Sequence, residues 1–171
     1  MTMPAQKPGR SEQSVGTPRV FLDAVEACFG TITLDVAASP HNAVCERFID
    51  EAQNGLTTPW DPDGLNWCNP PFARIASWVE KAYAEARDNS ARSLLLLPAS
   101  VGSNWWRDWV HGKAFVYLLN GRLTFVGHST PYPKDLVLLK YCNASVYSVA
   151  APYYEVWDWR KSLRHAQGAA A

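Results

Sequence analysis

The stretch Trp67-Cys68-Asn69-Pro70-Pro71-Phe72 contains groups that could position a flat substrate. Its two prolines fix two φ angles, remove two backbone donors and favour an extended backbone at the residues before them. The side-chain oxygen of Asn69 and the carbonyl of Pro70 are therefore held on a stiff edge as hydrogen-bond acceptors, with the Phe72 ring beside them. The alternative is a proline turn that only connects two elements.

Other polar residues follow other predicted strands. Asp35 lies near the carboxyl end of a buried-type strand around residues 32–36, and Ser100 follows the apolar run of residues 94–98. Thr17 and Pro18 suit the N-cap and first position of a helix. Because ligands of open α/β sheets bind beyond the carboxyl ends of the strands, we expect these residues to meet at one edge. The alternative for Asp35 is a carboxylate that satisfies its own loop.

The elements that position these residues follow from periodicity. Apolar spacing predicts helices over residues 18–29, closed by Gly30, over residues 73–89, and after Ser103. Strands are predicted at residues 65–68, 94–98 and 134–141, with a further candidate at 144–150. Residues 114–119 and 122–127 are predicted to form a hairpin around Asn120-Gly121. Alternating strands and helices indicate a three-layer α/β sandwich with a mixed sheet that ends in an antiparallel hairpin.

Length and composition are those of one ordinary domain. The chain has 171 residues, and we expect a single domain over 17–164 with disordered tails at 1–16 and 165–171. No apolar run approaches the roughly 18 residues of a membrane span, and residues 1–16 lack a signal-peptide pattern, so we predict a cytoplasmic protein with no membrane partner. Sixteen basic and sixteen acidic residues indicate no particular partner. The four cysteines lack CxxC spacing, so no metal site is expected.

Six stretches, in this order, resemble the phage-type DNA adenine-N6 methyltransferases: TP, LDVAAS, ERFIDEAQNGL, WCNPPF, LLLPAS and GRLTF. The similarity runs from Thr17 to Tyr141. NPPF is one form of the (Asp/Asn/Ser)-Pro-Pro-(Tyr/Phe/Trp) motif of amino methyltransferases that use S-adenosylmethionine. The resemblance implies a Rossmann-like methyltransferase fold, S-adenosylmethionine as cofactor and double-stranded DNA as partner. It also implies direct methyl transfer to the exocyclic amine of an adenine that is flipped out of the duplex.

The resemblance assigns roles to particular residues. The catalytic motif is Asn69, Pro70, Pro71 and Phe72, in which two oxygen acceptors would hold the amine and the ring would stack on the base. The residues implied for the cofactor are Thr17, Pro18, Asp35, Ala37 and Asp50, although related enzymes carry glycines where this chain has Ala37, Ala38 and Ser39. The residues implied for the substrate are Arg122, Phe125 and Tyr132, with Arg122 on a phosphate; the alternative for Arg122 is a surface ion pair.

Two other functions fit the same residues. The glycine-poor loop and the neutral charge would also fit a non-catalytic DNA-binding or cofactor-sensing relative of the fold. The motif alone also occurs in enzymes that act on RNA or on protein glutamine. Trp105, Trp106 and Trp109 fit core packing or DNA contacts. Protection of phage DNA from restriction is a role that the resemblance suggests, whereas the target sequence and the oligomeric state are not specified.

Overall fold

The computed structural model describes residues 15–144 and 152–168, with side chains placed up to residue 163, and contains a mixed six-stranded sheet. The strand order is β1-β2-β3-β5-β4-β6. β1, β2 and β3 are parallel, β5 is antiparallel to both β3 and β4, and β6 is parallel to β4. The strands are β1 (Leu34–Asp35), β2 (Leu65–Cys68), β3 (Arg92–Pro98), β4 (Phe115–Leu119), β5 (Leu136–Tyr141) and β6 (Tyr153–Trp157).

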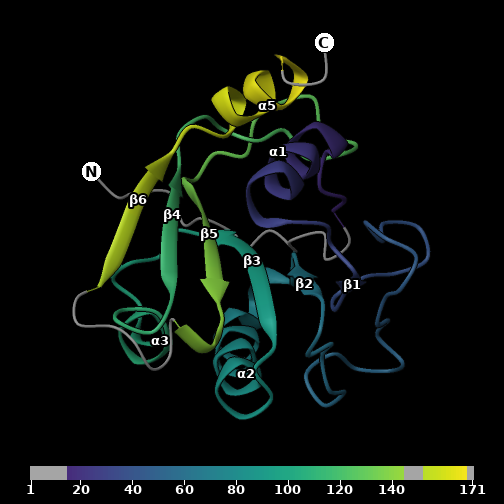
Figure 1. Ribbon diagram of the computed structural model, residues 1–171, viewed down its shortest axis with the longest axis vertical. Coiled ribbons are helices and arrows are strands. Elements are labelled where there is room, and N and C mark those ends of the chain that lie inside the picture. Colours follow the sequence, from purple (N-terminus) through teal and green to yellow (C-terminus); the bar gives the residue numbers. More distant parts are fainter. Residues whose placement is uncertain (1–14, 145–151, 169–171) are drawn as a thin grey trace, which may run out of the picture.

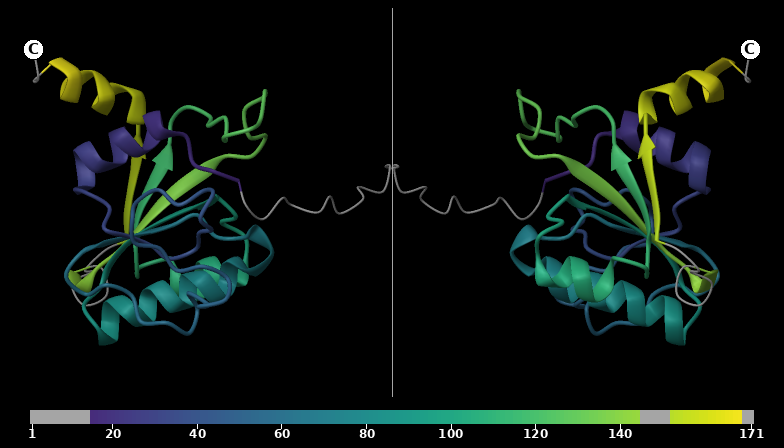
Figure 2. Two further views of the ribbon diagram at one scale, coloured as in Figure 1. Left: turned by 90° about the vertical axis from the view of Figure 1, so that its right-hand side faces the viewer. Right: turned by 90° about the vertical axis from the view of Figure 1, so that its left-hand side faces the viewer.

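Helices cover both faces of the sheet (Figures 1 and 2). One face carries α1 (Arg19–Phe29) and α5 (Trp159–Gly168), which pack against each other. The other face carries α2 (Ile75–Asp88), preceded by the short 3-10 helix η1 (Phe72–Arg74), and α3 (Asn104–Trp109). The expected mixed α/β architecture with antiparallel strand pairs is therefore confirmed, and its layers are helix, sheet and helix.

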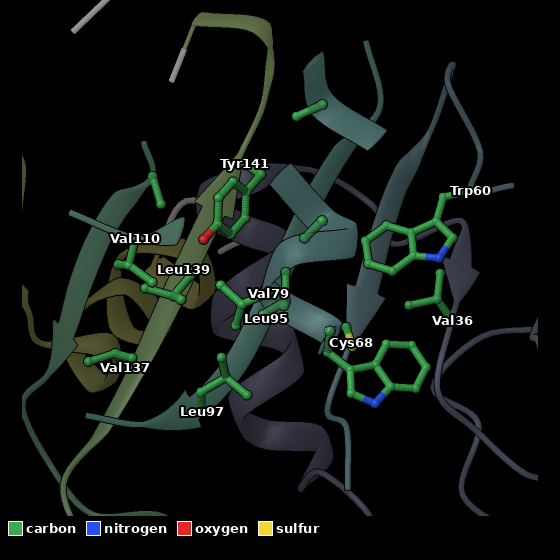
Figure 3. Close-up of a cluster of buried hydrophobic side chains, with 14 of the residues drawn as sticks. Val36, Trp60, Cys68, Val79, Leu95, Leu97, Val110, Val137, Leu139 and Tyr141 are labelled. Atoms are coloured by element: carbon green, nitrogen blue, oxygen red, sulfur yellow. The ribbon is translucent and has the colours of Figure 1, made fainter. Parts of the chain in front are cut away.

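The two layers of core arise from alternation along the central strands. In β3, Leu94 and Leu96 pack beneath α1, whereas Leu95 and Leu97 pack against α2. Figure 3 shows the second cluster, in which Leu95 and Leu97 lie with Val79 of α2 and with residues of β5. All four leucines are fully buried, as a continuous apolar strand between two helical layers must be.

The start of α1 differs from the prediction. The helix begins at Arg19 with Pro18 as its N-cap, and no side chain caps it, so the prediction of Thr17 as a capping residue is wrong. The Thr17 hydroxyl instead accepts a hydrogen bond from Asn69. The predicted end of this helix is confirmed, because Gly30 adopts φ +101°, a conformation that side chains disfavour.

The predicted hairpin around Asn120-Gly121 is also wrong. β4 pairs with β5, and residues 120–135 connect them as a long loop without strand structure. Leu123 and Phe125 are buried under the α1 layer, while Arg122 and Val126 are exposed. The alternating pattern that suggested a strand is therefore satisfied by a loop that folds its apolar side chains onto the core.

The C-terminal elements were not predicted. β6 adds a strand beside β4, and α5 continues to Gly168, into the segment 165–171 for which a disordered tail was expected. The strand predicted at 144–150 lies almost entirely outside the described residues. Among the residues that the structure describes, no helix is both long and apolar enough to span a membrane.

Candidate functional site

The motif Asn69–Phe72 follows β2 directly, at the carboxyl edge of the parallel strands. Pro71 has φ −55° and ψ 121°, so the chain leaves the strand as a stiff extended segment. The Pro71 carbonyl then accepts a hydrogen bond from the Arg74 amide as η1 begins. The Pro70 carbonyl accepts no hydrogen bond from the described part of the chain. The predicted stiff edge is thus present, and among the described residues one backbone acceptor on it has no donor.

The Asn69 side chain has a defined orientation. Its Nδ2 donates to the Val15 carbonyl at 3.0 Å and to the Thr17 hydroxyl oxygen at 3.3 Å. A backbone carbonyl can only accept, so the nitrogen end of the amide must face Val15. Within the described residues nothing donates to Oδ1, which is left as an acceptor. The side chain is only partly exposed, so this acceptor sits on a sheltered edge.

Three aromatic side chains predicted for the site meet beside this motif. The ring centroids of Phe72 and Tyr132 are 5.8 Å apart at an interplanar angle of 66°. Those of Tyr132 and Phe125 are 5.7 Å apart at 86°. Edge-to-face pairs of this kind stabilise one another beyond their burial. Phe125 is buried, whereas Phe72 and Tyr132 are partly exposed and could offer surface to a base.

Asp35 ends β1 as predicted, but it is almost completely buried. Its Oδ1 accepts a hydrogen bond from the Ala37 amide at 3.3 Å, and its Oδ2 accepts one from the Val44 amide at 3.2 Å. Burial raises the pKa of the Asp35 carboxyl to about 6, against the opposing effect of these two donors. The carboxylate therefore supports the loop that follows β1, which is the alternative role considered for it above.

A cavity of about 460 Å³ lies between this loop and the start of α1. Of the residues predicted for the cofactor, Thr17 lines it, whereas Pro18, Asp35, Ala37 and Asp50 do not. The full lining comprises Gly16, Thr17, Arg19, Leu22, Ser39, His41, Asn42, Ala43, Val44 and Val126. Thr17 therefore connects the cavity to Asn69, and Val44 connects it to Asp35.

Asp50 lies apart from this cavity. Phe48 forms a parallel bridge with Asp35, so a short extended segment lies beside β1 and Asp50 follows it. The Asp50 Oδ1 accepts from the Gln53 amide at 2.9 Å, and Gln53 Oε1 accepts from the Asp50 amide at 3.1 Å. A second, more open cavity of about 380 Å³, lined in part by Phe48 and Gln53, adjoins this turn.

Arg122 lies on the loop of residues 120–135 and is exposed. Its Nη1 donates to the Pro133 carbonyl at 2.7 Å, and its Nη2 is 3.8 Å from a carboxylate oxygen of Asp135. Arg160 of α5 donates to the Arg122 carbonyl at 3.3 Å, so a second exposed cation lies beside the first. Arg122 therefore combines a loop-holding role with a position next to Tyr132.

The tryptophans of α3 pack against other side chains of the protein and do not form a shared exposed surface. Trp106 is buried in the core beneath α2. The Trp109 ring lies 5.4 Å from that of Tyr83, and the Lys113 ammonium lies 5.1 Å from the Trp109 centroid. These contacts favour the packing role that was considered for them.

Sequence reasoning missed several residues of this region. Val15 and Gly16 hold Asn69 and the loop of residues 120–135 through backbone atoms, which no side-chain pattern reveals. Ser39 and Asn42 line the cavity from an irregular loop. Arg160 comes from a helix that the sequence did not predict.

Comparison with known proteins agrees with these features. The family described as DNA N-6-adenine-methyltransferase (Dam) matches residues 6–137. A protein of Escherichia phage T1, named DNA N-6-adenine-methyltransferase, is 32% identical over 108 residues, which cover 63% of this chain and 45% of that protein. The alignment thus spans less than half of the length of this relative. Because the family match covers most of the chain and includes the Asn69–Phe72 motif and the whole loop after β4, the chain belongs to the Dam family of DNA N-6-adenine-methyltransferases.

Proposed function

We propose that this protein transfers a methyl group from S-adenosylmethionine to N6 of adenine in double-stranded DNA, in the cytoplasm of a bacterial host. The observation that carries the proposal is the orientation of Asn69. Its Nδ2 donates to the Val15 carbonyl and the Thr17 hydroxyl oxygen, and no group in residues 15–144 or 152–168 donates to its Oδ1, an acceptor on the residue directly before Pro70 in the chain. The family match and the phage relative support DNA adenine as the acceptor.

Two acceptors suit the chemistry of the adenine amine. The nitrogen lone pair is delocalised into the ring, which makes the amine a poor nucleophile. Asn69 Oδ1 and the Pro70 carbonyl would each accept one amine hydrogen, and together they would turn the lone pair out of the ring plane. Pro71 keeps both oxygens on a rigid backbone, so little ordering remains when the base arrives.

The aromatic side chains would hold the base. An adenine in a duplex cannot reach an edge of this kind, so the base must be flipped out at a cost of a few kcal/mol. Stacking of the flipped base on the Phe72 ring would offset about 1–3 kcal/mol of this cost. Tyr132 contacts the Phe72 ring edge-on and would keep it from turning away.

The cavity beside Thr17 fits a cofactor of this kind. Its volume of about 460 Å³ lies within the range of roughly 300–1,000 Å³ that ligand sites occupy. Thr17, Ser39 and Asn42 supply hydroxyl and amide groups to its wall, and Val126 brings the loop that carries Phe125 to the same cavity. S-adenosylmethionine supplies an electrophilic methyl group on its sulfonium.

The remaining cofactor residues have different places in this proposal. Asp35 would act indirectly, because its Oδ2 accepts a hydrogen bond from the amide of Val44, and Val44 lines the cavity. For Pro18, Ala37 and Asp50, a direct contact with the cofactor stays a prediction.

The test is methyl transfer from labelled S-adenosylmethionine to unmethylated bacterial DNA, followed by nucleoside mass spectrometry. We expect N6-methyladenine from the wild-type protein, and a loss of at least about a hundredfold in Asn69→Ala, the scale on which removal of one aligned polar group slows an enzyme. Asn143→Ala is the matched control, because Asn143 is exposed and bonds to Ser90 away from the site.

Each contrary result has a defined meaning. Full activity of a folded Asn69→Ala protein would refute the site. Cofactor binding without any methylated nucleoside would favour the non-catalytic alternative. Transfer to RNA or to a glutamine peptide, but not to DNA, would refute adenine in DNA as the acceptor.

A further inference from the structure

Residues Val15, Gly16 and Thr17, here called the N-terminal strap, bridge two parts of the site. On one side the strap accepts both Asn69 hydrogen bonds, through the Val15 carbonyl and the Thr17 hydroxyl. On the other side the Gly16 carbonyl accepts a hydrogen bond of 3.0 Å from the Val126 amide. In Figure 2 the segment that enters α1 runs towards the loop between β4 and β5. The strap thus joins the catalytic motif to the loop that carries Phe125 and Tyr132.

The approach between the strap and this loop is close. A Cβ atom at Gly16 would lie 3.3 Å from the Val126 Cβ, which is tighter than most packing contacts. Thr17 itself is buried, at 8% exposure, so its hydroxyl faces the interior of the site. The strap is therefore held from both sides and can transmit a fixed geometry to Asn69.

Two acceptors on the strap, the Val15 carbonyl and the Thr17 hydroxyl oxygen, decide which end of the Asn69 amide meets the substrate. If the Asn69 amide turned by 180°, Oδ1 would face the Val15 carbonyl and Nδ2 would face the substrate amine. Two carbonyl oxygens would then oppose each other, and two donors would meet at the substrate. The reverse orientation is therefore both destabilised and unable to accept an amine hydrogen.

We propose that Thr17 is a positioning residue, which together with the Val15 carbonyl keeps the Asn69 amide turned with Oδ1 toward the substrate. This inference rests on the proposed function and gives Thr17 a role beyond that of a wall of the cofactor cavity. The hydroxyl accepts from Nδ2 and is itself free to donate into the cavity, so cofactor binding and amide orientation are coupled through one side chain.

The kinetic test compares Thr17→Val with Thr17→Ser. Valine keeps the shape of the side chain and removes the hydroxyl, whereas serine keeps the hydroxyl. We expect Thr17→Val to lower kcat by roughly ten- to a hundredfold, because a misaligned reacting group costs on that scale. Thr17→Ser should restore kcat to within about twofold, since it retains the acceptor for Nδ2. The affinity for S-adenosylhomocysteine, measured by calorimetry, should change far less than kcat in Thr17→Val.

A second measurement does not depend on turnover. In ¹⁵N-labelled protein the side-chain NH₂ signals of Asn69, identified by their loss in Asn69→Ala, should exchange slowly with solvent. Loss of one hydrogen bond in Thr17→Val should speed that exchange by roughly fivefold, with Thr17→Ser close to wild type.

The outcomes separate this inference from the proposed function. Unchanged kcat and unchanged NH₂ exchange in Thr17→Val would overturn the positioning role. Loss of S-adenosylhomocysteine affinity with normal kcat at saturating cofactor would also overturn it, because Thr17 would then be a cofactor contact only. If no variant, including wild type, methylates DNA, the proposed function fails, and the NH₂ exchange still decides whether Thr17 orients Asn69.

Discussion

At the scale of single residues, Asp35 is a buried carboxyl whose ionisation the fold disfavours. Its pKa rises from an ordinary value of 3.8 to about 6 because burial outweighs the two amide donors. Well below pH 3.8 the carboxyl is protonated in both the folded and the unfolded chain. Between pH 4 and pH 6 the unfolded chain releases the proton first, so the free energy of unfolding falls as the pH rises through this window.

This carboxyl gives a pH-dependent prediction. Relative to wild type, Asp35→Asn should gain up to about 3 kcal/mol in unfolding free energy between pH 4 and pH 7, since one pKa unit corresponds to about 1.4 kcal/mol. Urea unfolding across this range measures the difference. Asp61→Asn is the control, because Arg47 lowers the pKa of Asp61 and the difference from wild type should stay flat above pH 4. An Asp35→Asn curve parallel to wild type would contradict the role of burial.

At the scale of elements, the loop of residues 120–135 brings cations and aromatic rings to the same edge. Arg122 and Arg160 are exposed neighbours. The Arg122 guanidinium donates a hydrogen bond to the Pro133 carbonyl, and Lys134 is the next residue in the chain. A loop with this content suits a duplex, because phosphates are held by cations while a base is held by rings. The internal hydrogen bonds of the loop keep these groups together.

The loop gives a prediction on DNA binding. Arg160→Gln should weaken duplex binding and reduce the slope of log affinity against log salt by about 1, as expected for the loss of one phosphate contact. Arg122→Gln should do the same and also loosen the loop, so its kcat should fall as well. Arg87→Gln is the control, because Arg87 lies in the last turn of α2, at the end of the helix farther along the chain from the Asn69–Phe72 motif. Fluorescence anisotropy at several salt concentrations measures the slopes, and an unchanged slope in both variants would place the duplex elsewhere.

At the scale of the whole molecule, the C-terminal elements are part of the core although the family match ends at residue 137. The Phe21 ring of α1 lies 5.9 Å from that of Trp157 and 5.4 Å from that of Trp159. Both tryptophans are buried, at 7% and 6% exposure. They pack against the Phe21 ring, so they support the helix that the strap enters.

This cluster predicts a large effect on stability. Trp157→Ala should lower the free energy of unfolding by about 3–5 kcal/mol, as for other large aromatic truncations in a core. Val156→Ala, on the same strand but 67% exposed, should change it by no more than about 0.5 kcal/mol. Thermal unfolding followed by circular dichroism compares the two. Equal effects would show that the C-terminal elements are not part of the cooperative unit.

Local patterns predicted the elements whose signal is long. The apolar face of α2 and the leucine run of β3 repeat over many residues, so tertiary contacts had little scope to override them. The loop after β4 shows the opposite case, because Leu123 and Phe125 alternate as in a strand and are buried by folding onto the core. β6 was missed since four of its five residues are exposed and carry no alternation.

The site divides in the same way. The sequence by itself determined the stiff backbone of Asn69-Pro70-Pro71-Phe72, because two proline rings fix two φ angles whatever surrounds them. It also named Phe125 and Tyr132; the Tyr132 ring contacts Phe72, and the Phe125 ring contacts Tyr132. Only the tertiary structure decided that Asp35 supports its own loop and that Thr17 bonds to Asn69 rather than capping α1. The Asn69 partners lie 52 and 54 residues away in the chain, and a hydrogen bond over that separation depends on how the whole sheet edge packs, which no local pattern records.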